Sequence, residues 1–255
     1  MEEGDKPDAV IDDDLLWLAS CLAHESVRTD RLLADPYASH LAGPRGARVF
    51  AERSAKEHGL AAVLTVAVVD ELLQKTILEQ RVHTVVDLSA GLDTRPFRLR
   101  LPNDLRWIEL DGDALLLYKS FRLAHIVSAC RVERVSIDVR DAAQRAAVLR
   151  RASRGVTRGL LLTENLLGRV DPDVLTDIAP ALPRGIKSWI LGMPGWAPGA
   201  HGLIEAICAA GWEVTDRRPL GDEGRRLLPA RHEWGQAQPE RDPGDVWLLS
   251  RLPAA

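Results

Sequence analysis

The sequence predicts an α/β fold in which a mostly parallel, seven-stranded sheet carries helices on both faces. Short apolar runs recur along the chain, and segments of helical length separate most of them. Most of the runs are predominantly apolar, which is typical of strands buried on both faces of a parallel sheet. They cover residues 83–89, 105–110, 132–138, 159–165, 186–192, 212–217 and 245–251.

Helices are expected ahead of the first apolar run. Residues 12–26 place leucines at helical spacing behind a cluster of aspartates, which suits a helix N-terminus. Residues 61–80 are apolar on more than one face, so we predict a helix buried between layers. Pro and Gly in residues 35–46 are typical of a connection. We therefore expect a helical extension over residues 1–80, followed by the sheet core over 81–255.

The segments between the apolar runs complete this pattern. Residues 113–126, 140–153, 171–182 and 201–211 have the length and composition of helices. Residues 219–245, rich in Gly, Pro, Arg and Glu, predict a long surface excursion before the last strand.

Composition narrows the classes of function. The 33 basic and 37 acidic residues give a net charge of −4 without a polybasic run, which argues against a nucleic-acid partner. Cys21, Cys130 and Cys208 lie far apart, so neither a disulfide framework nor a cysteine-rich metal site is indicated. No apolar run reaches the roughly 20 residues of a membrane helix. We expect a cytoplasmic protein with a small-molecule substrate, no metal and no membrane partner.

The ends of the predicted strands carry the candidate binding residues, because ligands of such sheets lie beyond the carboxyl ends of strands. After the first run, Ser89, Ala90 and Gly91 are small enough for backbone to approach a ligand closely. Asp93 opens the next segment. Asp111 ends the second run, where a carboxylate can accept both hydroxyls of a ribose.

The next two strand ends extend this pattern. Asp138 can accept a hydrogen bond from an exocyclic amine and Val139 can pack on a ring, which suits adenine. Glu164 stands at the fourth strand end. Acids at four consecutive ends disfavour a pyrophosphate, so the pattern predicts an adenosine ligand without phosphates. Helix N-caps at Asp111 and Asp138, and an ordinary tight turn between the first two strands, are the alternatives.

The stretches "VVDLSAGLDTRPFRL" and "LPNDLRWIELDGDALLLYK" resemble the signature of the leucine carboxyl methyltransferase family, which includes tetracenomycin-type polyketide O-methyltransferases. The family motif is G-A-G-L-D-T-R. Residues 31–43 and 160–170 also resemble family segments. The resemblance implies a Rossmann-like class I methyltransferase fold with an antiparallel final strand, and S-adenosylmethionine as cofactor.

Matching positions carry the family's cofactor contacts onto this chain. The resemblance implies that the turn from Ser89 to Asp93 flanks the methionyl part and that Asp111 meets the ribose. It also implies that Asp138 and Val139 bound the adenine and that Glu164 lines the cofactor pocket.

The chain departs from the family pattern at several positions. Ser89 replaces the first glycine of the motif. Thr65, Val66 and Ala67 stand where the family has an R-T-R-like run whose arginine pairs with the cofactor carboxylate, and Leu22 stands at another basic position. Loss of such a charge-assisted pair commonly costs a few kcal/mol.

The chain also lacks one aromatic residue of the family pattern, and other basic residues are candidates to replace the missing charge. The aromatic residue that follows the fourth-strand motif is replaced within "LLGRV". Arg28, Arg31, Lys75 and Arg95 are the candidates to supply the missing positive charge.

Methyl transfer from an activated sulfonium requires alignment more than side-chain catalysis. His201 and His232 are candidate bases for a hydroxyl acceptor, with an ordinary surface role as the alternative. We expect an O-methyltransferase acting on a carboxylate or hydroxyl of a small molecule, typically a bacterial natural-product intermediate. The alternative is the same fold used for cyclase or isomerase chemistry or as a non-catalytic partner, which the altered basic positions favour.

Overall fold

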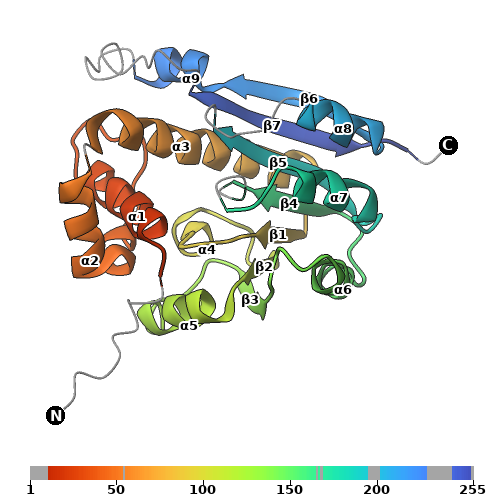
Figure 1. Cartoon of the computed structure of the whole chain (residues 1–255), viewed down its shortest axis with the longest axis horizontal. Helices are drawn as coiled ribbons and strands as arrows, with labels where there is room; N and C mark the ends of the chain where they lie inside the picture. Colours follow the sequence, from red (N-terminus) through yellow and green to blue (C-terminus); the bar gives the residue numbers. More distant parts are fainter. Residues whose placement is uncertain are drawn as a thin grey trace.

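The computed structural model describes residues 11–53, 55–164, 166, 169–194, 202–228 and 243–253, and Figure 1 shows its arrangement. Its centre is a seven-stranded sheet in the order β3-β2-β1-β4-β5-β7-β6. The first five strands pair in parallel, and β7 is antiparallel to both β5 and β6. The strands are β1 Thr84–Leu88, β2 Arg106–Asp111, β3 Arg131–Ser136, β4 Gly159–Thr163, β5 Ile186–Pro194, β6 Trp212–Pro219 and β7 Gly244–Arg251. The predicted α/β class, the seven strands and the antiparallel final strand are confirmed.

Successive residues of each central strand face opposite layers of helices, as the period of two along a strand requires. Val86 and Ile108 pack with one set of helices, and Val85 and Trp107 pack with the other. The first set is α6 Ala142–Ala152, α7 Asp173–Ala181 and α8 Leu203–Ala209, and the second is α3 Ala55–Glu79 and α9 Leu220–Leu227. The central strands β1, β2 and β4 are therefore covered on both faces and are buried almost throughout, whereas β3 and β6 at the two edges are mostly half-buried or exposed.

Helix α1, Asp13–Ser26, begins where the sequence predicts, whereas α3, Ala55–Glu79, begins six residues before the predicted helix over residues 61–80. Helix α1 starts at Asp12, whose side chain accepts a hydrogen bond from the backbone N–H of Asp14 at 2.9 Å. Helix α3 is buried on two sides, because Leu64 packs on the sheet and Val63 packs toward α1. Figure 1 places α1 and the following helix α2 beside the short helix α4, Arg95–Arg98, and helix α5, Asp113–Arg122, at the edge where β1 and β2 end. No described helix combines the length and hydrophobicity needed to cross a bilayer.

The connection predicted at residues 35–46 is wrong for most of its length, because helix α2, Ala38–Glu52, runs through it. Gly43 interrupts the helix with φ 60° and ψ −173° just before Pro44, so these residues produce a kink. Gly46 allows α2 to pass close to α1. A Cβ atom there would lie 2.9 Å from the carbonyl oxygen of Leu16, so α2 crosses α1 too closely for a side chain.

The surface excursion predicted over residues 219–245 needs a partial correction. Helix α9 begins directly after β6, and Leu220 and Leu228 are buried against the α3 side of the sheet. Arg226 of α9 pairs with Glu71 of α3 at 2.7 Å. Residues 229–242 lie outside the described part of the chain.

A buried ion network ties α5 to the sheet. The Lys119 ammonium lies 2.7 Å from one carboxylate oxygen of Glu109, and both side chains are fully buried. The other oxygen of Glu109 accepts from Nε of Arg134 at 2.7 Å. Because the Lys119 and Glu109 side chains are both removed from water, each depends on the other for its polar contacts, and the partly exposed Arg134 satisfies the second oxygen of Glu109.

We expect Lys119→Met to lower the free energy of unfolding by about 3 kcal/mol, because it leaves one oxygen of the buried Glu109 carboxylate without its partner. Urea denaturation at pH 7 measures the loss. Arg131→Met is the matched control, since Arg131 pairs with Glu133 while 76% exposed and should change stability by less than about 1 kcal/mol. Equal losses for the two variants would contradict a stabilising role for the network.

Candidate functional site

The predicted binding residues gather at one edge of the sheet. From β1 the chain builds outward to β2 and β3, and then returns to place β4 on the other side of β1. This reversal of strand order is the position where α/β sheets bind ligands. The carboxyl ends of β3, β2, β1 and β4 are consecutive there, so the residues that follow them face a common region.

The turn after β1 is held tightly against β2. Ser89 and Gly91 both have left-handed backbone conformations, with φ of 66° and 51°. The N–H of Ser89 donates to the carbonyl oxygen of Leu110 at 2.8 Å, and that of Ala90 donates to the same oxygen at 3.3 Å. The left-handed conformation costs a non-glycine residue such as Ser89 about 1 kcal/mol. The turn therefore keeps a strained backbone at the place where the family motif has glycine.

Asp111, at the end of β2, has a side chain that is only 4% exposed and is fully surrounded by donors. Its Oδ1 accepts from the N–H of Gly112 at 2.8 Å, and its Oδ2 accepts from the N–H of Gly91 at 2.9 Å. Arg169 adds a two-pronged contact, from Nη2 to Oδ1 at 3.0 Å and from Nη1 to Oδ2 at 2.9 Å. Nη1 of Arg169 also donates to Oγ of Ser89 at 2.5 Å.

Neither Asp111 nor Asp138 caps a helix, so the alternative interpretation of these two acids is wrong. The N-cap of α5 is Gly112, and the N-cap of α6 is Asp141. Asp138 is exposed and accepts from the N–H of Arg140 at 2.9 Å.

An open cavity of about 360 Å³ borders Arg169, the residue that contacts Asp111, although Asp111 is not among the described residues that line it. Val139 lines it, whereas Asp138 is not among the described residues that do. The structure thus separates the two residues that the sequence assigns jointly to adenine. The cavity is lined by Ile11, Asp12, Leu15, Leu115, Val139, Arg140 and Arg169.

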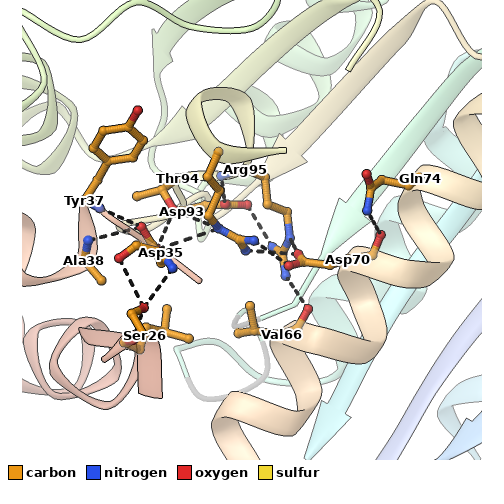
Figure 2. Close-up of polar contacts among 12 residues, drawn as sticks. Ser26, Asp35, Tyr37, Ala38, Val66, Asp70, Gln74, Asp93, Thr94 and Arg95 are labelled. Carbon is orange, nitrogen blue, oxygen red and sulfur yellow. Dashed lines mark hydrogen bonds and ion pairs between the residues drawn. The ribbon is translucent and has the colours of Figure 1, made fainter. Parts of the chain in front are cut away.

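Arg95 is the centre of the other half of the site. Its Nε lies 2.6 Å from Asp70 of α3, and its Nη1 lies 2.8 Å from Asp93 and 2.6 Å from Glu164. Figure 2 shows the Arg95 side chain extending from the turn after β1 toward Asp70 on α3. The residue is only 2% exposed. One buried guanidinium therefore joins α3, the β1 turn and the end of β4.

Arg98, one turn further along α4, completes this group. Its Nη2 donates to Asp70 at 3.0 Å, and its Nη1 contacts the second oxygen of the same carboxylate. Asp35 accepts from Oγ1 of Thr94 at 2.5 Å and from two backbone N–H groups (Figure 2). We call the set the arginine cluster, and it consists of Arg95, Arg98, Asp35, Asp70, Asp93 and Glu164.

Burial and charge shift the acids of the arginine cluster in different directions. Burial raises the pKa of Asp93, but the positive charges of Arg95, Lys119 and Arg98 together outweigh that effect and hold the pKa below its usual value. Burial raises the pKa of Glu164 despite the opposing charge of Arg95, and burial also raises the pKa of Asp35. Oε1 of Glu164 is buried without a hydrogen-bond partner in the described part of the chain.

Two of the positions that depart from the family pattern, Leu22 and Val66, face this cluster. Leu22 of α1 and Val66 of α3 line a cavity of about 30 Å³ together with Asp93, Arg95 and Glu164. The hydroxyl of Thr65 instead donates to the backbone of its own helix, and Ala67 packs against α1. Apolar side chains therefore stand at the arginine cluster where the family has basic ones.

Of the candidate replacement cations, Arg95 lines the small cavity. Arg28 contacts Asp30 at 2.9 Å, and both Arg31 and Lys75 are exposed. Arg95 is fully engaged by carboxylates, so its charge is already matched within the protein.

Four residues of the site were not among the sequence candidates. Arg98 lies three positions after Arg95 and Asp70 four positions after Val66, spacings that place each pair on one helix face. Asp35 lies in the segment that resembles the family's N-terminal motif. Nothing in the sequence pairs Arg169 with Asp111.

The catalytic candidates His201 and His232 lie outside the described residues. Within the described ranges, no group of three or more histidine, cysteine or acidic side chains is arranged to hold a metal ion.

Sequence comparison assigns the chain to a family. The leucine carboxyl methyltransferase profile matches residues 16–161, more than half of the chain. The protein belongs to this family. A Frankia alni protein named as an S-adenosyl-L-methionine-dependent methyltransferase is 33% identical over 161 residues, which cover 59% of this chain and 56% of that protein. A Saccharopolyspora erythraea protein of the same name is 33% identical over 49% of this chain and 47% of its own length. The chain therefore matches about half the length of these curated relatives.

Solved structures support the fold. A DUF574 family protein from Streptomyces avermitilis aligns over 91% of this chain and 100% of its own, with a TM-score of 0.57 and 15% identity. A protein from Thermobifida fusca, named as a methyltransferase, aligns over 91% of this chain and 97% of its own, with a TM-score of 0.55 and 15% identity. The chain has the class I methyltransferase fold.

Asp87 of β1 provides a test of the electrostatics beneath the site. It is 3% exposed, and its Oδ2 has no hydrogen-bond partner among the described residues. Burial, reinforced by repulsion from Asp93, raises the pKa of Asp87 well above its usual value. The native state therefore keeps a proton that the unfolded chain releases above about pH 4, so this group costs stability as the pH rises from there to its native pKa.

Asp87→Asn removes that cost. We expect the variant to gain stability relative to the wild type as the pH rises from about 4, by up to about 1.4 kcal/mol per pH unit. Urea denaturation from pH 4 to 8 measures the difference, with the exposed Asp104→Asn as the control for the change of charge. A difference that stays constant over this range would show that native Asp87 ionises normally.

Proposed function

We propose that this protein binds S-adenosylmethionine and transfers its methyl group to an oxygen atom of a small molecule. One observation carries the proposal: the Asp111 carboxylate stands at the reversal of strand order, oriented by the N–H groups of Gly91 and Gly112. A carboxylate fixed in this way suits the two hydroxyls of a ribose. The family membership and the names of the relatives support the same cofactor.

The arginine cluster fits the methionyl part of that cofactor by charge. Its four carboxylates outnumber its two guanidinium groups. The unpartnered Oε1 of Glu164 offers a buried acceptor, which a bound ammonium group would satisfy. An ammonium and a sulfonium both carry positive charge, so the excess of carboxylate favours this end of S-adenosylmethionine over an anion.

When bound, S-adenosylmethionine supplies an already activated methyl group, so the residues of this chain have to bind, orient and exclude water. Leu15, Leu18 and Leu22 of α1 cover the arginine cluster and limit the access of water to it. A carboxylate acceptor requires no general base, whereas a hydroxyl benefits from one. The net charge of −4 supports a small acceptor such as a natural-product intermediate rather than a nucleic acid.

One specific observation favours a second candidate function, in which the fold does not transfer a methyl group. Leu22 and Val66 line the cavity at the arginine cluster, and the arginines that line it with them, Arg95 and Arg98, are already paired with carboxylates. A cofactor carboxylate would gain no additional cation from these described residues. This arrangement favours a family member that uses the fold for a non-methylating reaction or as a non-catalytic partner.

Calorimetric titration with S-adenosylhomocysteine tests the cofactor assignment. We expect the wild type to bind and Asp111→Asn to bind at least about tenfold more weakly, because the amide replaces one acceptor oxygen and removes the charge. Asp113→Asn is the matched control, since Asp113 lies two residues further on and is exposed. We expect it to bind as the wild type does.

Two outcomes would contradict parts of this proposal. If the wild type fails to bind S-adenosylhomocysteine and S-adenosylmethionine at millimolar concentration, the non-methylating alternative replaces it. If both asparagine variants bind equally well, the ribose assignment of Asp111 is wrong while cofactor binding stands.

A further inference from the structure

Arg169 lies in the segment between β4 and α7, yet its guanidinium reaches the ends of β1 and β2. It contacts both oxygens of Asp111, at 2.9 and 3.0 Å, and the hydroxyl of Ser89 at 2.5 Å. The partners lie 58 and 80 positions away in the sequence. Arg169 follows β4, which lies on the opposite side of β1 from β2. Its contact with Asp111 therefore bridges the ends of β4 and β2 at the proposed ribose position.

The hydrogen-bond capacity of Asp111 is used up by these contacts. A carboxylate offers about four lone-pair positions. Two of those on Asp111 receive the N–H groups of Gly91 and Gly112, which the backbone fixes in place. The other two receive the Nη1 and Nη2 groups of Arg169. A ribose diol also needs two acceptor positions, so it cannot bind Asp111 while the Arg169 contact is in place.

We propose that Arg169 competes with the ribose for Asp111, and that its displacement determines how tightly an adenosine ligand binds. The inference rests on the proposed cofactor and names the residue that sets the affinity of the site. In the structure, Arg169 compensates a carboxylate that is only 4% exposed. On binding, the two ribose hydroxyls take over the acceptor positions that Arg169 leaves.

The surroundings of Arg169 allow such a displacement. Its side chain is 30% exposed and borders the cavity of about 360 Å³, so the guanidinium has both water and space beside it. The carbonyl oxygen of Arg169 accepts from Nη2 of Arg140 at 2.7 Å, which holds the backbone. Rotation of the Arg169 side chain into this space would free the acceptor positions of Asp111.

The contact also links two departures from the family pattern. Ser89 replaces the first glycine of the motif after β1, and Arg169 lies in the segment where the family's aromatic residue is absent. The hydroxyl that Ser89 introduces is an acceptor for the guanidinium of Arg169. Ser89 holds this position in spite of its left-handed φ of 66°. Ser89 and Arg169 thus combine to keep the acceptor positions of Asp111 occupied.

The test is calorimetric titration of the full chain with S-adenosylhomocysteine, adenosine and 2′,3′-dideoxyadenosine. We expect Arg169→Met to bind S-adenosylhomocysteine and adenosine about tenfold more tightly than the wild type, because nothing competes for Asp111. Binding of 2′,3′-dideoxyadenosine should not improve, since it lacks both hydroxyls. Arg169→Lys, which keeps the charge but cannot form the two-pronged contact, should show a smaller gain.

Arg150→Met is the control for loss of a positive charge, because Arg150 is exposed on α6, and it should bind as the wild type does. Circular dichroism confirms that each variant is folded. If the wild type binds S-adenosylhomocysteine and Arg169→Met binds no more tightly, Arg169 does not compete, and only this inference is overturned. An equal gain for adenosine and 2′,3′-dideoxyadenosine also overturns it. If neither protein binds S-adenosylhomocysteine, the proposed function fails, and this inference fails with it.

Discussion

The buried guanidinium of Arg95 is the interaction on which the site depends. It bonds to Asp70 of α3, to Asp93 in the turn after β1 and to Glu164 after β4, so it fixes three separate segments relative to one another. Removing a partner from a buried ion group leaves an uncompensated charge that costs several kcal/mol. Displacing any one of these segments would therefore break a buried ion pair, and residues of α1 line the small cavity beside the same guanidinium.

The central strands were predictable because burial on both faces leaves a direct trace in the sequence, and each of the seven predicted runs overlaps a strand. The errors in the fold have a different cause. Gly43 and Pro44 read as a connection, but the chain uses them as a kink within α2. Gly46 is required by the contact between α1 and α2, and that contact has no signature in the local sequence.

In the candidate site, too, some residues could be predicted from the sequence and others could not. The strand-end acids were predictable, because parallel topology brings consecutive strand ends to one edge. Their partners were not, since an ion pair joins positions that only the packed fold brings together. Arg169 is 58 residues from Asp111, and Asp70 is 25 from Arg95. The separation of Val139 from Asp138 at the large cavity has a similar origin, because adjacent residues in an irregular segment need not face the same side.

The two halves of the site differ in how their charges are matched. At the arginine cluster, carboxylates exceed guanidinium groups, and an acceptor oxygen of Glu164 stays unpartnered among the described residues. At Asp111, every acceptor position is filled by the protein itself. A cationic group therefore adds a contact at the first half without displacing one, whereas a diol at the second half must replace an existing ion pair. The affinity of the whole site for an adenosine ligand is the balance between that gain and that exchange.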